Sequence, residues 1–109
     1  VGDVGNIVLR DRQTLAQHGI IVVVAVIERS TGQLVSGPDL VSRGCVYIRE
    51  NEELVEEARQ VVENAIQECL DRRIIDWPRL KNAVRDDLND FLWHRMKRCP
   101  VILPVIMEV

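Results

Sequence analysis

The feature that most constrains the fold is a set of apolar residues that recur every three or four positions between residues 54 and 70. This spacing places them all on one face of an α-helix, while glutamates fill the opposite face. The apolar set is Leu54, Val55, Ala58, Val61, Val62, Ala65, Ile66, Cys69 and Leu70. The sequence therefore predicts a long amphipathic helix that begins after Asn51 and ends near Arg72 and Arg73, where basic side chains favour the helix dipole.

A second helix is predicted from the residues that follow. Asp76 is placed to cap its start, and Pro78 falls in the first turn, where the missing N–H has no cost. An apolar stripe continues through the helix: Trp77, Leu80, Val84, Leu88, Phe91 and Leu92. We expect this helix to end near Arg98, before Pro100.

Three segments have the character of β-strands. Residues 20–28 form a continuous β-branched apolar run, which indicates a strand buried on both faces or central in a sheet. After a turn at residues 30–32, a second strand is predicted over Gln33 to Ser42, with a bulge or a break at Gly37-Pro38. Residues 101–109 predict a closing strand that Pro104 interrupts, which favours an edge position or a bulge there.

The remaining segments are short. Residues 1–9 predict an irregular leading segment with a small strand, and residues 11–19 predict a short helix that Gly19 ends in the left-handed conformation. Residues 45–48 predict a short strand or an extended approach to the long helix. The order β-β-α-α-β predicts an α+β fold in which two helices pack on one face of a small mixed three-stranded sheet.

Composition limits the classes of function. The chain has 109 residues, 47% hydrophobic and 28% charged, which is typical of one globular domain. Its net charge of −3 disfavours a large basic face for nucleic acid. The odd count of three cysteines favours reduced thiols and a cytoplasmic location. The longest apolar run, residues 20–27, is far shorter than the ~20 residues of a membrane span.

No motif for catalysis is found. The residues that could bind zinc are His18, His94, Cys45, Cys69 and Cys99. No two of them form a CxxC, HxH or HExxH pair, so we expect no metal site and no cofactor site in this chain. Cys45 lies near a loop, but nothing in the sequence supplies it with a base. The glutamates fall on the solvent face of the long helix, and we expect no catalytic residue.

Four basic residues remain as candidates for binding. Arg95, Lys97 and Arg98 lie at a predicted helix C-terminus, where cations are stabilising for a purely structural reason. The functional alternative is contact with an RNA backbone or a partner subunit. Arg43 lies in a polar turn between Ser42 and Gly44, and this turn either has no further role or presents the arginine to a ligand or neighbouring domain.

Three segments together resemble one family. They are VGDVGNIVLRDR (residues 1–12), GPDLVSRGCVYIRE (residues 37–50) and KRCPVILPVIMEV (residues 97–109). The chain resembles the carboxyl-terminal part of ribonuclease J over essentially its whole length. The resemblance implies a larger parent enzyme with a metallo-β-lactamase core and an inserted β-CASP domain, which degrades and processes RNA as a 5′→3′ exonuclease and an endonuclease with two zinc ions. The family's zinc motifs, such as HxHxDH, do not occur in this chain.

The resemblance also implies an organisation and a role. Residues 1–19 would be the link from the catalytic region, and residues 20–109 the C-terminal domain. This domain would support a homo-oligomer, a dimer or tetramer, and full activity of the parent. Two alternatives are an RNA-contacting module that uses Arg43, Arg95, Lys97 and Arg98, and an independent enzyme.

Overall fold

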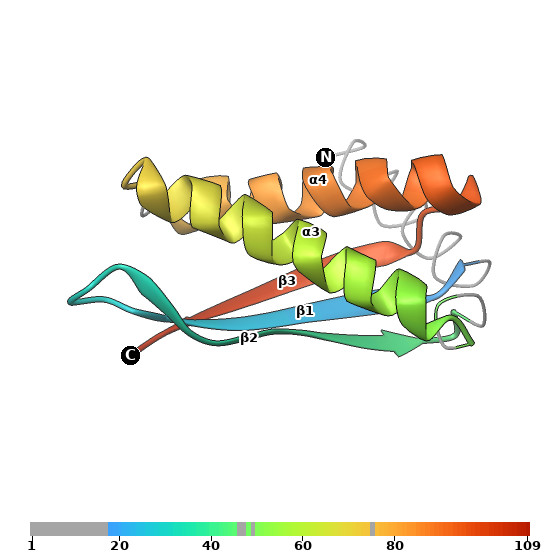
Figure 1. The fold of residues 1–109 in the computed structure, drawn as a ribbon, viewed down its shortest axis with the longest axis horizontal. Coiled ribbons are helices and arrows are strands. Elements are labelled where there is room, and N and C mark those ends of the chain that lie inside the picture. The colour runs from blue at the N-terminus through green and yellow to red at the C-terminus, as the bar shows by residue number, and fades with distance from the viewer. Residues whose placement is uncertain (1–17, 46–47, 49, 75) are drawn as a thin grey trace, which may run out of the picture.

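The computed structural model describes residues 18–45, 48, 50–74 and 76–109. The elements, in chain order, are β1 (Ile20–Glu28), β2 (Gln33–Arg43), α3 (Glu52–Asp71), α4 (Trp77–Met96) and β3 (Val101–Glu108). Figure 1 shows both helices on the same side of the sheet. The predicted α+β fold with the order β-β-α-α-β is confirmed. None of the described helices is long and apolar enough to span a membrane.

The sheet has the strand order β2-β1-β3. β1 is therefore central, which is one of the two alternatives predicted for residues 20–28. It pairs with β2 antiparallel and with β3 parallel, which makes the sheet mixed. The edge position predicted for the last strand is confirmed. The predicted interruption at Pro104 is wrong: β3 runs through this residue, which pairs with Val23. An edge strand tolerates proline because one side of it needs no donor.

The predicted irregularity at Gly37-Pro38 is a bulge. Val24 pairs with Asp39 and Val26 pairs with Ser36, so Gly37 and Pro38 together face a single residue of β1. Gly37 has a φ of +88°, and a Cβ there would lie 2.7 Å from the carbonyl oxygen of Val24. β2 continues beyond the bulge to Arg43, one residue past the predicted end.

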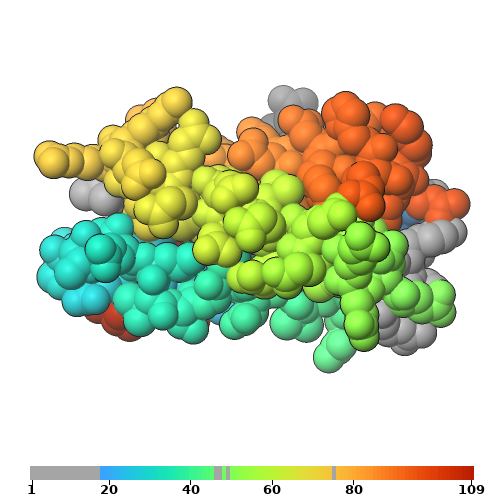
Figure 2. Space-filling view, viewed as in Figure 1, coloured from blue at the N-terminus to red at the C-terminus, as the bar shows by residue number. Residues whose placement is uncertain are grey.

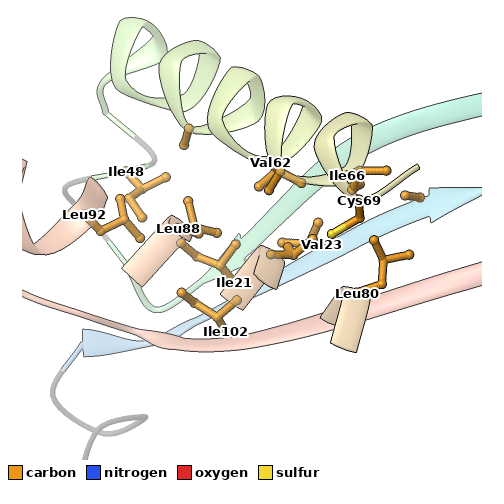
Figure 3. Close-up of a cluster of buried hydrophobic side chains, with 14 of the residues drawn as sticks. Ile21, Val23, Ile48, Val62, Ile66, Cys69, Leu80, Leu88, Leu92 and Ile102 are labelled. Carbon is orange, nitrogen blue, oxygen red and sulfur yellow. The ribbon is translucent and has the colours of Figure 1, made fainter. Parts of the chain in front are cut away.

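The core lies between the sheet and the two helices, and Figure 3 shows side chains from all these layers meeting there. In Figure 2 the side chains of α3 fill the space between α4 and β2. The predicted apolar faces of both helices point inward. The buried apolar residues are Ile21, Val23, Ala25, Ile27, Cys45, Ile48, Leu54, Ala58, Val62, Ala65, Ile66, Cys69, Leu80, Val84, Leu88, Leu92 and Ile102.

The helix ends differ in detail from the predictions. Asn51 caps α3, and its side-chain oxygen accepts a hydrogen bond from the Leu54 N–H at 3.0 Å. Asp76 occupies the N-cap position of α4, but its side chain makes no capping hydrogen bond. α4 ends at Met96, before the predicted Arg98, because Lys97 adopts the left-handed conformation with a φ of 57°.

Burial of β1 on both faces, the other alternative, is excluded, and three further predictions are wrong in part or fall on residues outside the described ranges. β1 is fully buried on one face only, since alternate residues from Ile20 to Glu28 are partly exposed. Ile48 lies in a helical turn rather than a strand, and residues 46–47 lie outside the described part. Most of the predicted helix over residues 11–19 also lies outside it, although Gly19 has the expected positive φ, +82°. The leading segment of residues 1–9 is not described.

Candidate functional site

The cysteine and histidine side chains do not converge. Within residues 18–45, 48, 50–74 and 76–109, no three His, Cys, Asp or Glu side chains come together as a metal site would require. Cys45 and Cys69 are buried, and Cys99 is half-buried. Burial raises the pKa of the Cys69 thiol, helped by the nearby Glu68 carboxylate, and burial likewise raises the pKa of Cys99. Raised pKa values keep these two thiols protonated, a poor state for a nucleophile or metal ligand.

Arg95, Lys97 and Arg98, at the end of α4 and just beyond it, each interact with different neighbouring groups. The Arg95 guanidinium forms a salt bridge with Glu57 of α3 and lies 5.6 Å from the Phe91 ring centroid. The Lys97 ammonium lies 5.8 Å from the Trp93 ring centroid, and this ring is 51% exposed. Arg98 is half-buried and has interactions of its own. Each cation is therefore engaged by a neighbouring group, which fits the structural role of cations near a helix end.

An open cavity of about 360 Å³ lies beside this cluster. It is lined by Asn51, Leu54, Arg95, Met96 and Arg98. Because Asn51 caps α3, the cavity lies at the positive end of that helix dipole. The exposed carboxylates of Glu52 and Glu53 in the first turn oppose this positive field. The cavity thus combines two guanidinium groups with nearby acids.

Arg43 lies at the same end of the domain but on a different side. It is the last residue of β2 and pairs with Ile20, the first residue of β1. Figure 1 shows the end of β2, the start of α3 and the end of α4 at one end of the domain. The exposed guanidinium donates to the Ser42 carbonyl at 3.4 Å. The structure therefore brings Arg95 and Arg98 together at one cavity and leaves Arg43 on the sheet.

The surface that the sequence analysis missed is the side of the sheet that faces away from the helices. Leu103 is 50% exposed, Met107 46% and Val41 43%, and all three are on β2 or β3. We call this surface the outer sheet face, and define it by Ile20, Val22, Val24 and Val26 of β1, Asp39, Val41 and Arg43 of β2, and Val101, Leu103, Val105 and Met107 of β3. Exposed apolar patches of this kind mark sites of association.

Comparison with known proteins identifies the family. The family model described as "Ribonuclease J C-terminal domain" matches residues 7–109. Over 109 residues the chain is 48% identical to Ribonuclease J2 of Bacillus subtilis (strain 168) and 44% identical to Ribonuclease J 2 of Staphylococcus epidermidis (strain ATCC 35984). Identity to Ribonuclease J 2 of Staphylococcus aureus (strain NCTC 8325) is 41%. Each alignment covers the whole chain but only 20% of the relative, so the chain spans about a fifth of these proteins. The chain belongs to the ribonuclease J C-terminal domain family.

Proposed function

We propose that this chain is the accessory C-terminal domain of a ribonuclease J-like enzyme. It would support oligomerisation and full activity of the parent without contributing catalytic residues. The parent would be a zinc-dependent 5′→3′ exonuclease and endonuclease of the metallo-β-lactamase type that processes and degrades RNA in the cytoplasm. Residues 1–19 would link the catalytic region to a domain formed by residues 20–109. Family membership and the relatives' names support this proposal.

The donor groups in the described part of the chain do not fit a site for two zinc ions. The described His, Cys, Asp and Glu side chains form no group of three, and burial raises the pKa of the Cys69 and Cys99 thiols. Zinc prefers deprotonated sulfur, neutral imidazole and carboxylate ligands in a compact set. We therefore place the zinc ions, and RNA hydrolysis, in the four-fifths of the parent outside this chain.

The observation that carries the assembly role is the outer sheet face. Its central residues, Val41, Val22 and Leu103, are apolar and partly exposed. A soluble domain that keeps Leu103 and Met107 in water loses the free energy that their burial would contribute. Contact with another protein surface recovers it.

The test is the oligomeric state of the full-length parent with and without residues 20–109, measured by sedimentation velocity. We expect deletion to lower the number of subunits in the main species and to reduce RNA hydrolysis. The control is the parent with Trp93→Glu. Trp93 lies on α4 and is exposed to a similar fraction as Leu103 of the outer sheet face. An unchanged number of subunits after deletion would remove the assembly role.

A second candidate function is RNA contact, and the cavity beside Arg95 and Arg98 favours it. Guanidinium groups bind phosphate oxygens in a two-pronged geometry. Lys97 and Arg43 lie at the same end of the domain and would add to the field there. Against it stand the net charge of −3 and the salt bridge that already engages Arg95.

This second function predicts a change in the salt dependence of RNA binding. Reversing the charge of Arg43, Arg95, Lys97 and Arg98 in the parent should weaken RNA affinity and flatten its dependence on salt concentration. Arg85→Glu is the matched control, because Arg85 is an exposed arginine in the middle of the same helix as Arg95. Equal affinity and equal salt slope in the reversed and control proteins would exclude RNA contact by these residues.

A further inference from the structure

The outer sheet face has an ordered pattern that points to its partner. Three complete rows of side chains cross it, each with one residue from each strand, and Val26 and Met107 continue the face beyond them. The central row is Val41, Val22 and Leu103; the flanking rows are Asp39, Val24 and Val105 on one side and Arg43, Ile20 and Val101 on the other. The central row is wholly apolar. Each flanking row ends in one exposed charge on β2, and the two charges are opposite.

We propose that a second copy of this chain packs face to face on the outer sheet face, with a two-fold axis along the central row. Turning the sheet about this axis lays each strand over its own copy in the opposite direction. The central row then meets itself, and each flanking row meets the other one. Asp39 therefore lies against Arg43 of the partner subunit, twice in each dimer. This inference rests on the proposed assembly role and names its surface.

The charge pattern is the reason for choosing a second copy rather than another protein. Asp39 and Arg43 lie at equal distances on either side of Val41 along one strand. A two-fold contact requires a surface that complements itself. If one residue of the first subunit contacts a second residue of the partner, then that second residue of the first subunit contacts the first residue of the partner. Opposite charges placed symmetrically about an apolar row meet this requirement. A two-fold axis along the strands would instead lay β2 over β3 and place both charges against apolar residues.

Both charged groups are available for such a contact. Among the residues that the structure describes, Arg43 donates one long hydrogen bond, of 3.4 Å, to the carbonyl of its neighbour Ser42. Asp39 is exposed. Its carboxylate helps to raise the pKa of Arg59, but less than Glu56 and Glu63 do, so Asp39 is only weakly coupled to that guanidinium. Two sheets packed in this way form an aligned sandwich about 10 Å thick, a common arrangement of β-sheets.

The area of the face sets the strength of the contact. With the axis on the central row, each strand overlaps its copy over about five residues, because β1 begins at Ile20. Three strands about 4.8 Å apart then cover roughly 14 Å by 17 Å. With their side chains, two such faces bury on the order of 600 Å² in total, which is less than a specific interface needs on its own. We therefore expect a concentration-dependent dimer contact within the parent, and not a permanent one.

The test uses the full-length parent and measures its dissociation constant by sedimentation velocity over a range of concentrations. Leu103→Glu places two like charges against each other on the axis and should raise the dissociation constant at least about tenfold. Asp39→Arg and Arg43→Asp should each raise it by about threefold to tenfold at low salt. The double variant, which exchanges the two charges, should return to within about twofold of the unmodified protein.

Matched controls separate folding from association. Trp93→Glu alters a residue that is 51% exposed, against 50% for Leu103, but lies on α4 and should leave the dissociation constant unchanged. Circular dichroism checks that each variant is folded. If Leu103→Glu does not fold, the charge exchange decides alone, since Asp39 and Arg43 are exposed.

The outcomes distinguish this inference from the proposed function. If deletion of residues 20–109 leaves association unchanged, the assembly role fails and the inference fails with it. If deletion weakens association while the variants of the outer sheet face do not, the assembly role stands and this surface is wrong. Weakening by Leu103→Glu without recovery in the double variant would show that another part of the parent covers the face, which also overturns the inference.

Discussion

Replacing Gly19 with alanine should destabilise the domain far more than the same replacement at Gly32. Both glycines have positive φ angles, +82° and +66°. This conformation costs an L-residue about 1–2 kcal/mol. The two sites differ in how closely other atoms surround the added Cβ. A Cβ at Gly32 would have nothing within 4 Å, whereas at Gly19 it would lie 2.4 Å from the Arg43 carbonyl oxygen and 2.6 Å from the Gly44 carbonyl carbon.

These contacts give the expected magnitudes. Alanine also restricts the unfolded chain, which favours folding by about 0.4–1 kcal/mol. Gly32→Ala should therefore lower the free energy of unfolding by about 0.5–1 kcal/mol. At Gly19 the overlap is with backbone atoms at the end of β2, which cannot rotate away, and overpacking adds about 1–3 kcal/mol. The expected loss for Gly19→Ala is then about 2–4 kcal/mol.

Urea denaturation followed by circular dichroism measures both losses, provided that the slope with urea stays constant. Gly44→Ala adds an intermediate case, because its Cβ would lie 3.4 Å from the Gly19 Cα and its φ is +70°. Equal losses at Gly19 and Gly32 would refute the reasoning, since they would mean that the backbone contact between the start of β1 and the end of β2 does not restrict position 19.

Three further substitutions test other parts of the structure. Leu88 is fully buried, so Leu88→Ala should cost about 2–5 kcal/mol in thermal or urea unfolding, and a loss below 1 kcal/mol would contradict its core position. Asn51→Ala removes the acceptor for the Leu54 N–H and should cost about 1 kcal/mol, whereas Asn51→Asp should keep most of the stability. Burial, and then the Glu68 carboxylate, raises the pKa of Asp87 in the folded state, so its contribution favours folding at low pH and is lost as the pH rises through the folded pKa. Asp87→Asn should consequently raise the free energy of unfolding at pH 7 by no more than about 0.5 kcal/mol and give no gain near pH 3; an equal gain at both pH values would exclude this cause.

The helices were predictable because their signals are local. Six of the nine apolar residues that predicted the inward face of α3 are buried, and Val55 and Leu70 pack partly buried against the core. The ends were less predictable, because several groups compete to satisfy a helix terminus. Asp76 has a side chain suited to capping, yet it makes no such bond, and Lys97 ends α4 without the glycine that usually takes a positive φ.

The sheet was only partly predictable. The continuous apolar run of β1 has no alternation from which to infer that one face contacts the helices and the other does not. Strand order supplies this information, and it depends on contacts between residues distant in sequence, such as Ile20 and Val101. The outer sheet face was therefore invisible before the three strands were placed side by side.

The four basic residues illustrate the same limit. Their positions near turns and helix ends were evident, but the salt bridge of Arg95 joins it to Glu57 on another helix, and no sequence pattern connects the two. The cavity beside Arg98 likewise requires α3 and α4 to meet. A single sequence shows which side chains carry charge and does not show which of them share a site.

The parallel pairing of β1 with β3 has a consequence for synthesis of the protein. β1 is made first and β3 last among the described strands, and residue 20 waits for residue 101 before its hydrogen bonds are complete. Until then one edge of β1 offers unpaired backbone groups to other chains. A polypeptide that lacks β3 would therefore be prone to aggregate through this open edge, and the sheet is complete only after β3 has been synthesised.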